Sequence, residues 1–488
     1  MAETELKFGL SEAAAAAAGA TLAARGAETL ALESRYFDTA DRALARAGIA
    51  LRLRRSGSAW EQTVKAEGAT PIERLEETVA LAPGPTAGTP APDPALHDGS
   101  AAAPLLAAAL DDDAALAPVF ATSVRRSALR IEIDGGELEV ALDRGVVRAG
   151  ERSLPVSEVE IELKSGDVGA LIAVGRASVD AHAMWLSTIA KATRGAWLAD
   201  GEAKRATKAR PPRLDRSAAG NELFRAMLQS CFDQVLANAS VVAEGDLDAE
   251  AIHQLRIGLR RLRTLRRELG RWRGGLGDDW QAPATELFHV LGVQRDRETV
   301  AASMQQRLLA AGSPDPALHV GASTDVDAVA AVRAPAFQHA LLDLLEFVLA
   351  PAAAPSAGDG ARRAIARRLD KLHKRLRRDG RRFAELDEPS RHAVRKRIKR
   401  LRYLAELVAP LYRQRRVERF LRALEPAQDA LGRFMDLVVA LALAHDVVAR
   451  GDARAWFNVG WLKAQLPEAV ERCAECLREV VDAEPFWR

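Results

Sequence analysis

The sequence has few cysteines and no long apolar run. Three cysteines in 488 residues cannot form a disulfide framework, which favours the reducing cytoplasm. The most hydrophobic run, residues 437–444, is far shorter than the ~18 residues that span a bilayer. The first residues lack the basic and apolar regions of a secretory signal. We therefore expect a cytoplasmic protein without membrane contact, and 48% hydrophobic with 28% charged residues indicates a folded chain.

Two common kinds of site are also missing from the sequence. It contains no glycine-rich phosphate loop and no nucleophile elbow, because its glycines stand alone at turn-like positions. The pair Cys473 and Cys476 has metal-ligand spacing, but no second pair and no nearby histidine completes four ligands. We expect these two to be ordinary helix cysteines.

The charge is distributed unevenly along the chain. Residues 1–200 carry 20 basic and 29 acidic side chains, a formal charge of −9. Residues 201–488 carry 49 basic and 38 acidic side chains, a charge of +11, although the whole chain has only +2. Opposite signs in the two parts indicate two domains with different partners, the second of them anionic.

The first part reads as β-strands in which charged and apolar residues alternate with a period of two. The clearest segments are 3–8, 52–54, 62–65, 74–76, 137–143 with a turn at Arg144–Gly145, and 158–164 with a turn at Ser165–Gly166. Short helices are expected near 10–18, 40–47 and 167–179, and a proline-rich loop or crossover, including Pro83 and Pro85, at 82–104. An ordinary solvated sheet face would show the same alternation. A sheet closed with its ionised face inward would instead enclose a polar tunnel.

After a linker at 201–216 the apolar period becomes 3.6, which predicts an all-helical second part. The expected helices are 217–240, 247–271, 283–310, 335–350, 361–384, 389–411, 416–449 and 453–483.

The helical part contains an internal repeat. The segment that begins at His253 matches the one that begins at His392, and a Leu–Gly pair follows each at nearly the same distance, at Leu291–Gly292 and Leu431–Gly432. In each copy basic side chains share one arc of the helix, about 80° wide, opposite a separate apolar stripe. The basic side chains are His253, Arg256, Arg260, Arg263 and Arg267 in the first copy and His392, Arg395, Lys399 and Arg402 in the second.

Such an arc attracts an external anion, because like charges one helical turn apart destabilise the helix. The alternative is a solvated face in an arginine-rich chain. Residues 361–384 add a further basic helix that includes His373. Amides and aromatic groups that read bases are scarce on these faces, so we expect a simple polyanion and no nucleic-acid partner.

The residues of the first part resemble the CYTH superfamily, the triphosphate tunnel metalloenzymes. Its opening signature is present as Glu3-x-Glu5-x-Lys7. In order there follow Tyr36-Phe37-Asp38-Thr39, Leu51-Arg52-Leu53-Arg54, Thr63-Val64-Lys65, Arg74-x-Glu76, Phe120-x-Thr122 with Arg126, Ala141-Leu142-Asp143-Arg144-Gly145, Glu158-x-Glu160-x-Glu162 and Lys191-Ala-Thr-Arg194-Gly195. Ala190 departs from the pattern, since relatives often place serine before the lysine. Residues 217–488, with the recurring His253 and His392, resemble the CHAD domain.

The resemblance implies an α+β multidomain protein: a closed antiparallel eight-stranded β-barrel with flanking helices, then an all-α helical bundle with two-fold internal repeat. It implies Mg²⁺ or Mn²⁺ held by Glu3, Glu5, Glu76, Asp143, Glu160 and Glu162. It further implies phosphate oxygens bound by Lys7, Arg52, Arg54, Lys65, Arg74, Arg126 and Lys191. The residues closest to the chemistry would be Glu3, Glu5, Lys7, Glu160 and Glu162.

The same resemblance suggests an inorganic triphosphatase that converts tripolyphosphate to diphosphate and phosphate, with domains at 1–200 and 217–488. The second domain would bind inorganic polyphosphate, which could place the protein at polyphosphate granules. Two alternatives stay open: a polyphosphate-binding protein with little or no catalysis, and a CYTH enzyme that acts on thiamine triphosphate or, as an adenylate cyclase, on ATP.

Overall fold

The computed structural model describes residues 2–68, 70, 72–81, 89–111, 113–201, 206–318, 327–350 and 360–488, with backbone alone for 2 and 293–298. Pro83 and Pro85 of the proline-rich segment and residues 202–205 of the expected linker lie outside this range. The chain forms two compact units. The first contains Met1–Thr207, Leu236–Leu255 and Val329–Ala350, and the second contains Lys208–Val235, Arg256–Ala328 and Pro351–Arg488.

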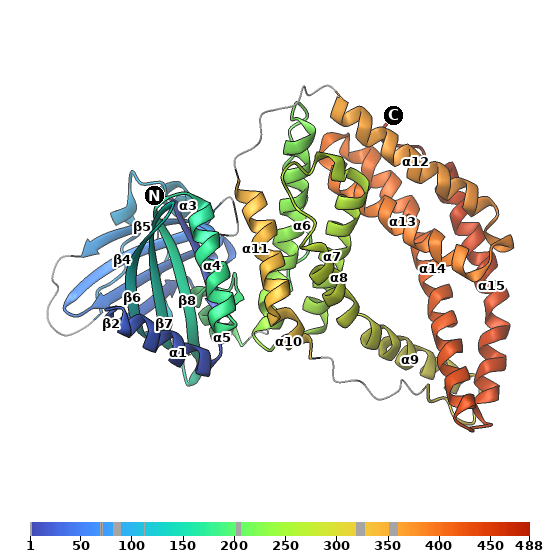
Figure 1. Cartoon of the computed structure of the whole chain (residues 1–488), viewed down its shortest axis with the longest axis horizontal. Helices are drawn as coiled ribbons and strands as arrows, with labels where there is room; N and C mark the ends of the chain where they lie inside the picture. The colour runs from blue at the N-terminus through green and yellow to red at the C-terminus, as the bar shows by residue number, and fades with distance from the viewer. Residues whose placement is uncertain are drawn as a thin grey trace. The chain divides into compact units, whose positions relative to one another are not determined.

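The first unit is built around a closed β-barrel (Figure 1). Eight antiparallel strands follow one another in the order β5-β4-β3-β2-β6-β7-β8-β1, and β1 pairs with β5 to close the ring. The short β9 adds to β1. The strands are β1 (Ala2–Gly9), β2 (Glu28–Asp38), β3 (Ile49–Ser56), β4 (Ala59–Glu67), β5 (Glu73–Leu81), β6 (Ala117–Ile133), β7 (Gly136–Ala149), β8 (Arg152–Gly166) and β9 (Trp185–Leu186). The predicted eight-stranded barrel is confirmed.

The period of two directs alternate side chains to the two sides of the barrel wall. In β1 the apolar Leu6 and Phe8 are fully buried on the outer side, where helix α4 (Val168–His182) packs. The predicted turn at Arg144–Gly145 is wrong, because β7 continues through both residues to Ala149. A Cβ atom on Gly145 would lie 2.0 Å from the backbone oxygen of Ser123 on β6, so the glycine permits close strand approach rather than a turn.

Helices cover the barrel where the sequence predicts them, near 10–18, 40–47 and 167–179. They are α1 (Glu12–Ala24), α2 (Ala43–Arg46) and α4, together with α3 (Ala103–Ala109) and α5 (Lys191–Asp200). Asp167 caps α4 by accepting a hydrogen bond from the backbone N–H of Ala170 at 3.1 Å. Helix α11 (Pro335–Leu349), from much later in the chain, packs against α4 in the same unit.

The rest of the chain is helical, as predicted. Its helices are α6 (Gly220–Ala243), α7 (Ala249–Leu269), α8 (Gln281–Val290), α9 (Val293–Ala310), α10 (Ala328–Arg333), α12 (Ala361–Arg381), α13 (Glu388–Val408), α14 (Gln414–Ala449) and α15 (Ala455–Asp482). Short 3-10 turns are η1 (Pro94–His97), η2 (Gly270–Trp272), η4 (Phe383–Glu385) and η5 (Ala409–Leu411). The single helix expected at 283–310 is two helices, interrupted at Leu291 and Gly292.

The apolar stripes of the repeated helices lie in the core. Leu255, Leu259 and Leu262 on α7 and Val394, Ile398 and Leu401 on α13 are at most 1% exposed. The spacing of these residues therefore predicts correctly which face of each helix is buried. Within the described residues, none of the helices combines the length and the apolar character needed to cross a membrane.

Candidate functional site: the charged tunnel and the basic helices

The barrel encloses a cavity of about 680 Å³ whose wall is rich in charge. Twelve of the thirteen side chains predicted to bind metal or phosphate line this cavity, and only Asp143 does not. They reach it from six strands and from α5 because inward-facing residues recur at every second position. The lining set comprises Glu3, Glu5, Lys7, Arg52, Arg54, Lys65, Arg74, Glu76, Arg126, Glu160, Glu162 and Lys191.

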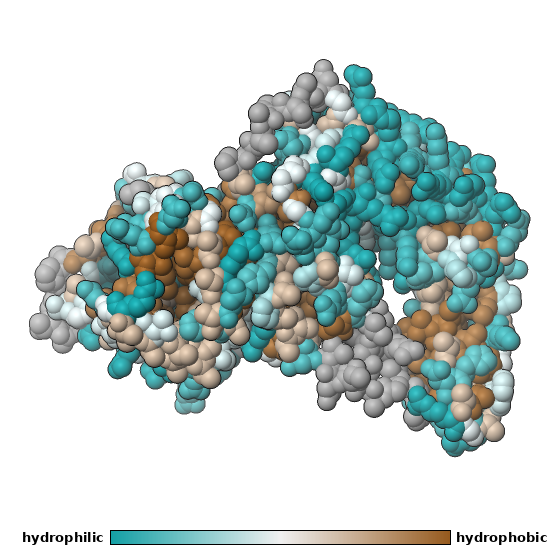
Figure 2. All heavy atoms as spheres, viewed as in Figure 1, coloured by the Kyte–Doolittle hydropathy of each residue, from teal (hydrophilic) through white to brown (hydrophobic). Residues whose placement is uncertain are grey.

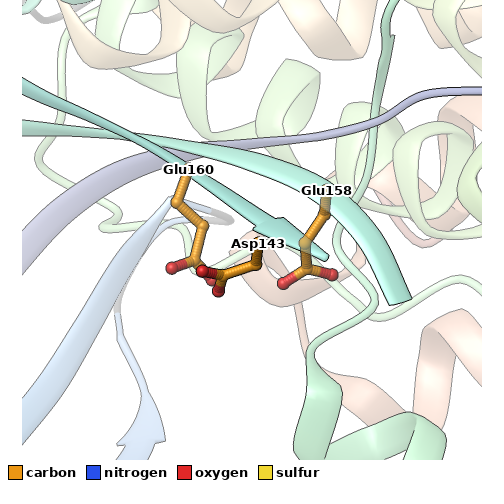
Figure 3. Close-up of side chains that lie close together, drawn as sticks. All are labelled: Asp143, Glu158 and Glu160. Carbon is orange, nitrogen blue, oxygen red and sulfur yellow. The ribbon is translucent and has the colours of Figure 1, made fainter. Parts of the chain in front are cut away.

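Three carboxylates from β7 and β8 converge at one place in the wall (Figure 3). Oxygen atoms of Asp143, Glu158 and Glu160 lie within 4.8 Å of one another. Asp143 and Glu158 are almost completely buried, with exposed fractions of 1% and 0%. We call these three residues the acidic triad. Three adjacent buried carboxylates repel one another and need cations beside them.

Two lysines neutralise much of the acidic triad. The Nζ atom of Lys7 lies 2.8 Å from Glu160 Oε1 and 3.5 Å from Glu158 Oε1. The Nζ atom of Lys191 contacts all three carboxylates, at 2.6 Å from Asp143 Oδ2 and 3.0 Å from Glu160 Oε1. Burial alone would lower the pKa of each lysine, but these carboxylates raise both above the ordinary value. Both lysines therefore remain charged and able to attract an anion.

An arginine completes this arrangement. Arg126 donates two hydrogen bonds to Asp143, at 2.8 and 2.7 Å, and one to Glu160 at 2.5 Å. Burial would raise the pKa of Glu160, but Lys191, Lys7 and Arg126 hold that pKa well below its ordinary value. The pKa of Asp143 is lowered in the same way, by Lys191 and Arg126 against the effect of burial. Asp143 and Glu160 are thus ionised and held in a fixed position.

Glu158 was missing from the predicted site residues. It faces inward because it continues the alternation of Glu160 and Glu162 along β8, and that alternation was the available signal. Nothing in the sequence shows that its side chain is fully buried behind the tunnel wall.

A second group of carboxylates lies on β1, β5 and β8. We call Glu3, Glu5, Glu76 and Glu162 the front group. Glu5 and Glu162 are direct cross-strand partners, and the side chains of the group are 11–31% exposed. Each of these carboxylates has a basic neighbour: Lys65 lies beside Glu3 and Glu76, Arg74 lies 3.3 Å from Glu5 Oε1, and Lys164 lies 2.7 Å from Glu162 Oε2.

The pKa values of the neighbouring acids Glu3 and Glu76 are shifted in opposite directions. Burial and a hydrogen bond with Glu76 raise the pKa of Glu3 to about 8. Burial would also raise the pKa of Glu76, but Lys65 and the hydrogen bond with Glu3 lower it to about 2. At neutral pH Glu3 therefore carries a proton on an oxygen atom that could otherwise bind a cation.

Two arginines of β3 extend the basic side of the tunnel. Arg52 is 4% exposed and donates a hydrogen bond to Thr63 Oγ1 at 3.0 Å. Burial and the neighbouring Arg52 lower the pKa of Arg54 to about 10. Repulsion between the two guanidinium groups would be relieved by a bound anion, and guanidinium groups match phosphoryl oxygens in geometry.

The basic arc of α7 surrounds an aromatic ring. The guanidinium carbons of Arg256, Arg260 and Arg263 lie 5.6, 5.0 and 5.5 Å from the centre of the Phe288 ring. Arg256 is only 6% exposed, whereas Arg263 is exposed. A Cβ atom on Gly292 would approach Arg256 Nη2 to 2.9 Å, which explains a glycine in the Leu–Gly pair of the first copy. The start of the arc at Arg256 is therefore buried inside the domain, whereas the arc is accessible to solvent at Arg263.

On α13 the second arc is half-buried. Arg395, Lys399 and Arg402 have intermediate exposure, and Arg402 donates hydrogen bonds to Glu406 at 2.6 Å and to Gln428 at 2.8 Å. Helix α13 is linked to α7 and α12 through the fully buried carboxylate of Glu268 on α7. This carboxylate accepts hydrogen bonds from Arg400 of α13 at 3.5 Å and from Arg368 of α12 at 2.5 Å.

The basic helix α12 presents most of its cations to solvent, and Figure 2 shows hydrophilic residues over this part of the surface. The inclusion of His373 among these cations is wrong. His373 is 2% exposed, its Nε2 lies 3.1 Å from the backbone oxygen of Val480, and burial lowers its pKa. It belongs to the apolar face of the helix.

Two domain families match consecutive parts of the chain. Residues 1–195 match the CYTH domain, and residues 226–445 match the CHAD domain. The chain contains a CYTH domain followed by a CHAD domain. The inorganic triphosphatase of Haemophilus influenzae is 37% identical over 76 residues, 16% of this chain and 22% of that protein. The chain thus matches about a fifth of the length of this curated relative.

Solved structures resemble the two domains separately. The CHAD domain of the plant Ricinus communis is 27% identical and covers 56% of this chain and 96% of its own, with a TM-score of 0.45. A putative adenylyl cyclase from Hippeastrum, whose structure is described as revealing a dominant triphosphatase activity, is 17% identical and covers 41% of this chain and 96% of its own, with a TM-score of 0.31.

The tunnel of the CYTH domain has the donor set that a hard divalent cation requires. Mg²⁺ and Mn²⁺ prefer carboxylate oxygens, which both the front group and the acidic triad offer. Four cationic side chains contact the triad, and the front group also has basic neighbours, namely Arg52, Lys65, Arg74 and Lys164. All four front-group side chains line the cavity, whereas Asp143 and Glu158 do not, so an added metal could reach the front group more directly.

Cys473 and Cys476 are buried and free, and burial raises the pKa of Cys473 to about 12. Among the described residues, the group of metal-ligand side chains that converges closely is the acidic triad.

Proposed function

We propose that the CYTH domain is a metal-dependent inorganic triphosphatase, which hydrolyses tripolyphosphate to diphosphate and phosphate. The observation that supports this proposal is the wall of the barrel cavity, where seven basic side chains that could bind phosphate face carboxylates that could hold a metal. The CHAD domain would bind inorganic polyphosphate through its two basic arcs. We accordingly place the protein in the cytoplasm, at polyphosphate granules.

In this proposal the basic side chains bind and orient the anion. Lys7, Lys191 and Arg126 are held by the acidic triad, so their positions are fixed before the substrate arrives. Arg52 and Arg54 neutralise further phosphoryl oxygens from β3. Phosphoryl transfer needs mainly positioning and charge stabilisation, which such a wall supplies.

The carboxylates of the front group would hold the metal and accept a proton from the attacking water. A bound Mg²⁺ or Mn²⁺ would supply Lewis-acid stabilisation of charge on the phosphoryl oxygens. Because Glu3 has a pKa of about 8, the pair that it forms with Glu76 can exchange a proton near neutral pH.

A second class of substrate is favoured by an aromatic part of the cavity wall. Tyr36 and Phe120 stack with their ring centres 4.4 Å apart, and both line the cavity together with Trp197. Figure 2 shows apolar residues inside the hollow of the first unit. An organic group attached to a triphosphate could pack here, so thiamine triphosphate and ATP are the substrates to compare.

Substrate profiling tests the proposal directly. We would measure phosphate release by the full chain from tripolyphosphate, thiamine triphosphate, ATP and long polyphosphate, with Mg²⁺, with Mn²⁺ and with EDTA. The expected result is metal-dependent release with the highest kcat/KM for tripolyphosphate. A chain that binds long polyphosphate but releases no phosphate from any of the four would support the binding-protein alternative.

The raised pKa of Glu3, which keeps a proton on this carboxyl group near neutral pH, predicts a pH dependence of metal binding. A metal must displace this proton, so Mg²⁺ affinity should rise by up to ~10-fold per pH unit from pH 6.5 toward pH 8 and then level off. The affinity rises with pH because the protonated form of Glu3, which does not bind the metal, predominates below a pH of about 8. Calorimetric titration of the full chain without substrate measures both affinity and proton release.

Two variants show which acid is responsible. Glu3→Gln should bind metal more weakly and without this pH dependence, whereas Glu33→Gln, an exposed glutamate whose Oε1 accepts from Ser123, should behave as wild type. An affinity that is constant between pH 6.5 and 8 in the wild-type chain would contradict the assignment.

A further inference from the structure

Part of the CHAD match packs against the barrel within the first compact unit. The backbone N–H of Thr188, which follows β9, donates to Ser240 Oγ of α6 at 3.0 Å. The N–H of Leu186 donates to Gln338 Oε1 of α11 at 2.7 Å. These contacts join the barrel to segments that lie beyond the CYTH match at 1–195.

One of these contacts is an ion pair that leads toward the tunnel. Glu244, directly after α6, accepts a hydrogen bond from Arg194 Nη2 of α5 at 2.5 Å. The side chains of Arg194 and Glu244 are only 10% and 12% exposed. An ion pair so well shielded from water is stronger than a surface pair, and loss of one partner leaves a costly buried charge.

Arg194 also faces the acidic triad. Its Nη1 lies 3.6 Å from Glu158 Oε2, while Glu158 Oε1 contacts Lys191 and lies 3.5 Å from Lys7. Lys7 and Lys191 line the cavity, whereas Arg194, Glu158 and Glu244 do not. Charges of alternating sign therefore run from Glu244 through Arg194 and Glu158 to the two lysines of the tunnel wall.

Glu244 supplies one of the carboxylates of this network. The four cations of the network are matched by four carboxylates, and Glu244 alone comes from outside the CYTH match. The cations are Lys7, Arg126, Lys191 and Arg194, and the carboxylates are Asp143, Glu158, Glu160 and Glu244. Without Glu244, Arg194 would draw Glu158 toward itself, and Glu158 would move away from Lys191 and Lys7.

We propose that Glu244, a residue of the CHAD match, is a positioning residue for the CYTH tunnel: through Arg194 and Glu158 it sets the positions of Lys7 and Lys191. This inference rests on the proposed triphosphatase function. It makes the affinity of the tunnel for a triphosphate depend on a residue of the other matched domain.

The test is steady-state kinetics and tripolyphosphate binding by the full chain with Glu244→Gln. Displaced lysines bind the anion less well, so KM should rise about 10-fold and kcat should change less than about 3-fold. Glu244→Asp keeps the charge and should restore most of the affinity. Arg194→Gln removes the same link from the other side, and its combination with Glu244→Gln should be clearly non-additive.

Asp343→Asn is the matched control. It breaks the pair between Asp343 of α11 and Arg176 of α4, at 2.7 Å, which also joins a later segment to the barrel but lies outside the tunnel. It should leave KM unchanged. An equal rise of KM in this control, or an unchanged KM in Glu244→Gln and Arg194→Gln, would overturn the inference while the wild type remains active. A wild type that neither binds nor hydrolyses tripolyphosphate would instead overturn the proposed function, and this inference with it.

Discussion

Replacing Glu5 or Glu162 with glutamine is expected to lower kcat/KM for tripolyphosphate about 10²- to 10³-fold at limiting Mg²⁺. The two carboxylates are direct partners on the adjacent strands β1 and β8, and both line the barrel cavity. Like charges in this position destabilise a sheet unless a cation lies between them. A site that contains both acids is therefore suited to a divalent ion, and either substitution removes one ligand of that ion.

The fold should survive these changes, because neither side chain is in an apolar core. The side chains of Glu5 and Glu162 are 11% and 23% exposed and face the solvated cavity. Thermal unfolding should shift by only a few degrees, and raising Mg²⁺ should restore part of the activity because the loss is mainly one of metal affinity. The exposed Glu33→Gln again serves as the control. Activity within tenfold of wild type in both variants at limiting metal would refute a metal in the front group.

The sequence patterns predicted the barrel where charge alternates strictly, as in β1 and β8. Alternation does not reveal strands β2 and β6, because some neighbouring inward and outward residues hardly differ in polarity, as Ser34 and Arg35 or Arg125 and Arg126 illustrate. Gly145 was mistaken for a turn because local sequence cannot show the close approach of a neighbouring strand.

The site residues are named by the resemblance to the CYTH superfamily, and strand periodicity explains why most of them share one cavity. Eleven of the twelve named side chains meet in one cavity because each lies on an inward-facing strand position, and Lys191 reaches it from α5. The separation of the carboxylates into a neutralised triad and a front group depends on distances across the barrel, which the sequence does not contain. Glu244 is further removed still, since it lies 50 residues from Arg194 in the chain.

Neutralising both basic arcs of the CHAD domain together is expected to abolish polyphosphate binding nearly completely. The first set is Arg260, Arg263 and Arg267, and the second is Arg395, Lys399 and Arg402, each changed to glutamine. Arg256 is left unchanged because it is buried beside Phe288. Each set alone should weaken binding and flatten the salt dependence by about one unit of slope per lost phosphate contact.

The measurement is a salt titration of the full chain in EDTA, which separates this binding from metal-dependent chemistry in the tunnel. A third set on α12, Lys371, Lys374 and Arg375 changed to glutamine, removes the same charge from exposed positions outside the repeat. If one polyphosphate chain occupies both arcs, its affinity exceeds that for either arc alone. Each arc set should then lower the affinity more than the α12 set does. The two arc sets combined should lower it by more than the sum of their separate effects. Equal effects from all three sets would show that the arcs attract polyphosphate only through general positive charge. Tighter binding of duplex DNA of matched phosphate content at every salt concentration would show that the basic helices do not select a simple polyanion.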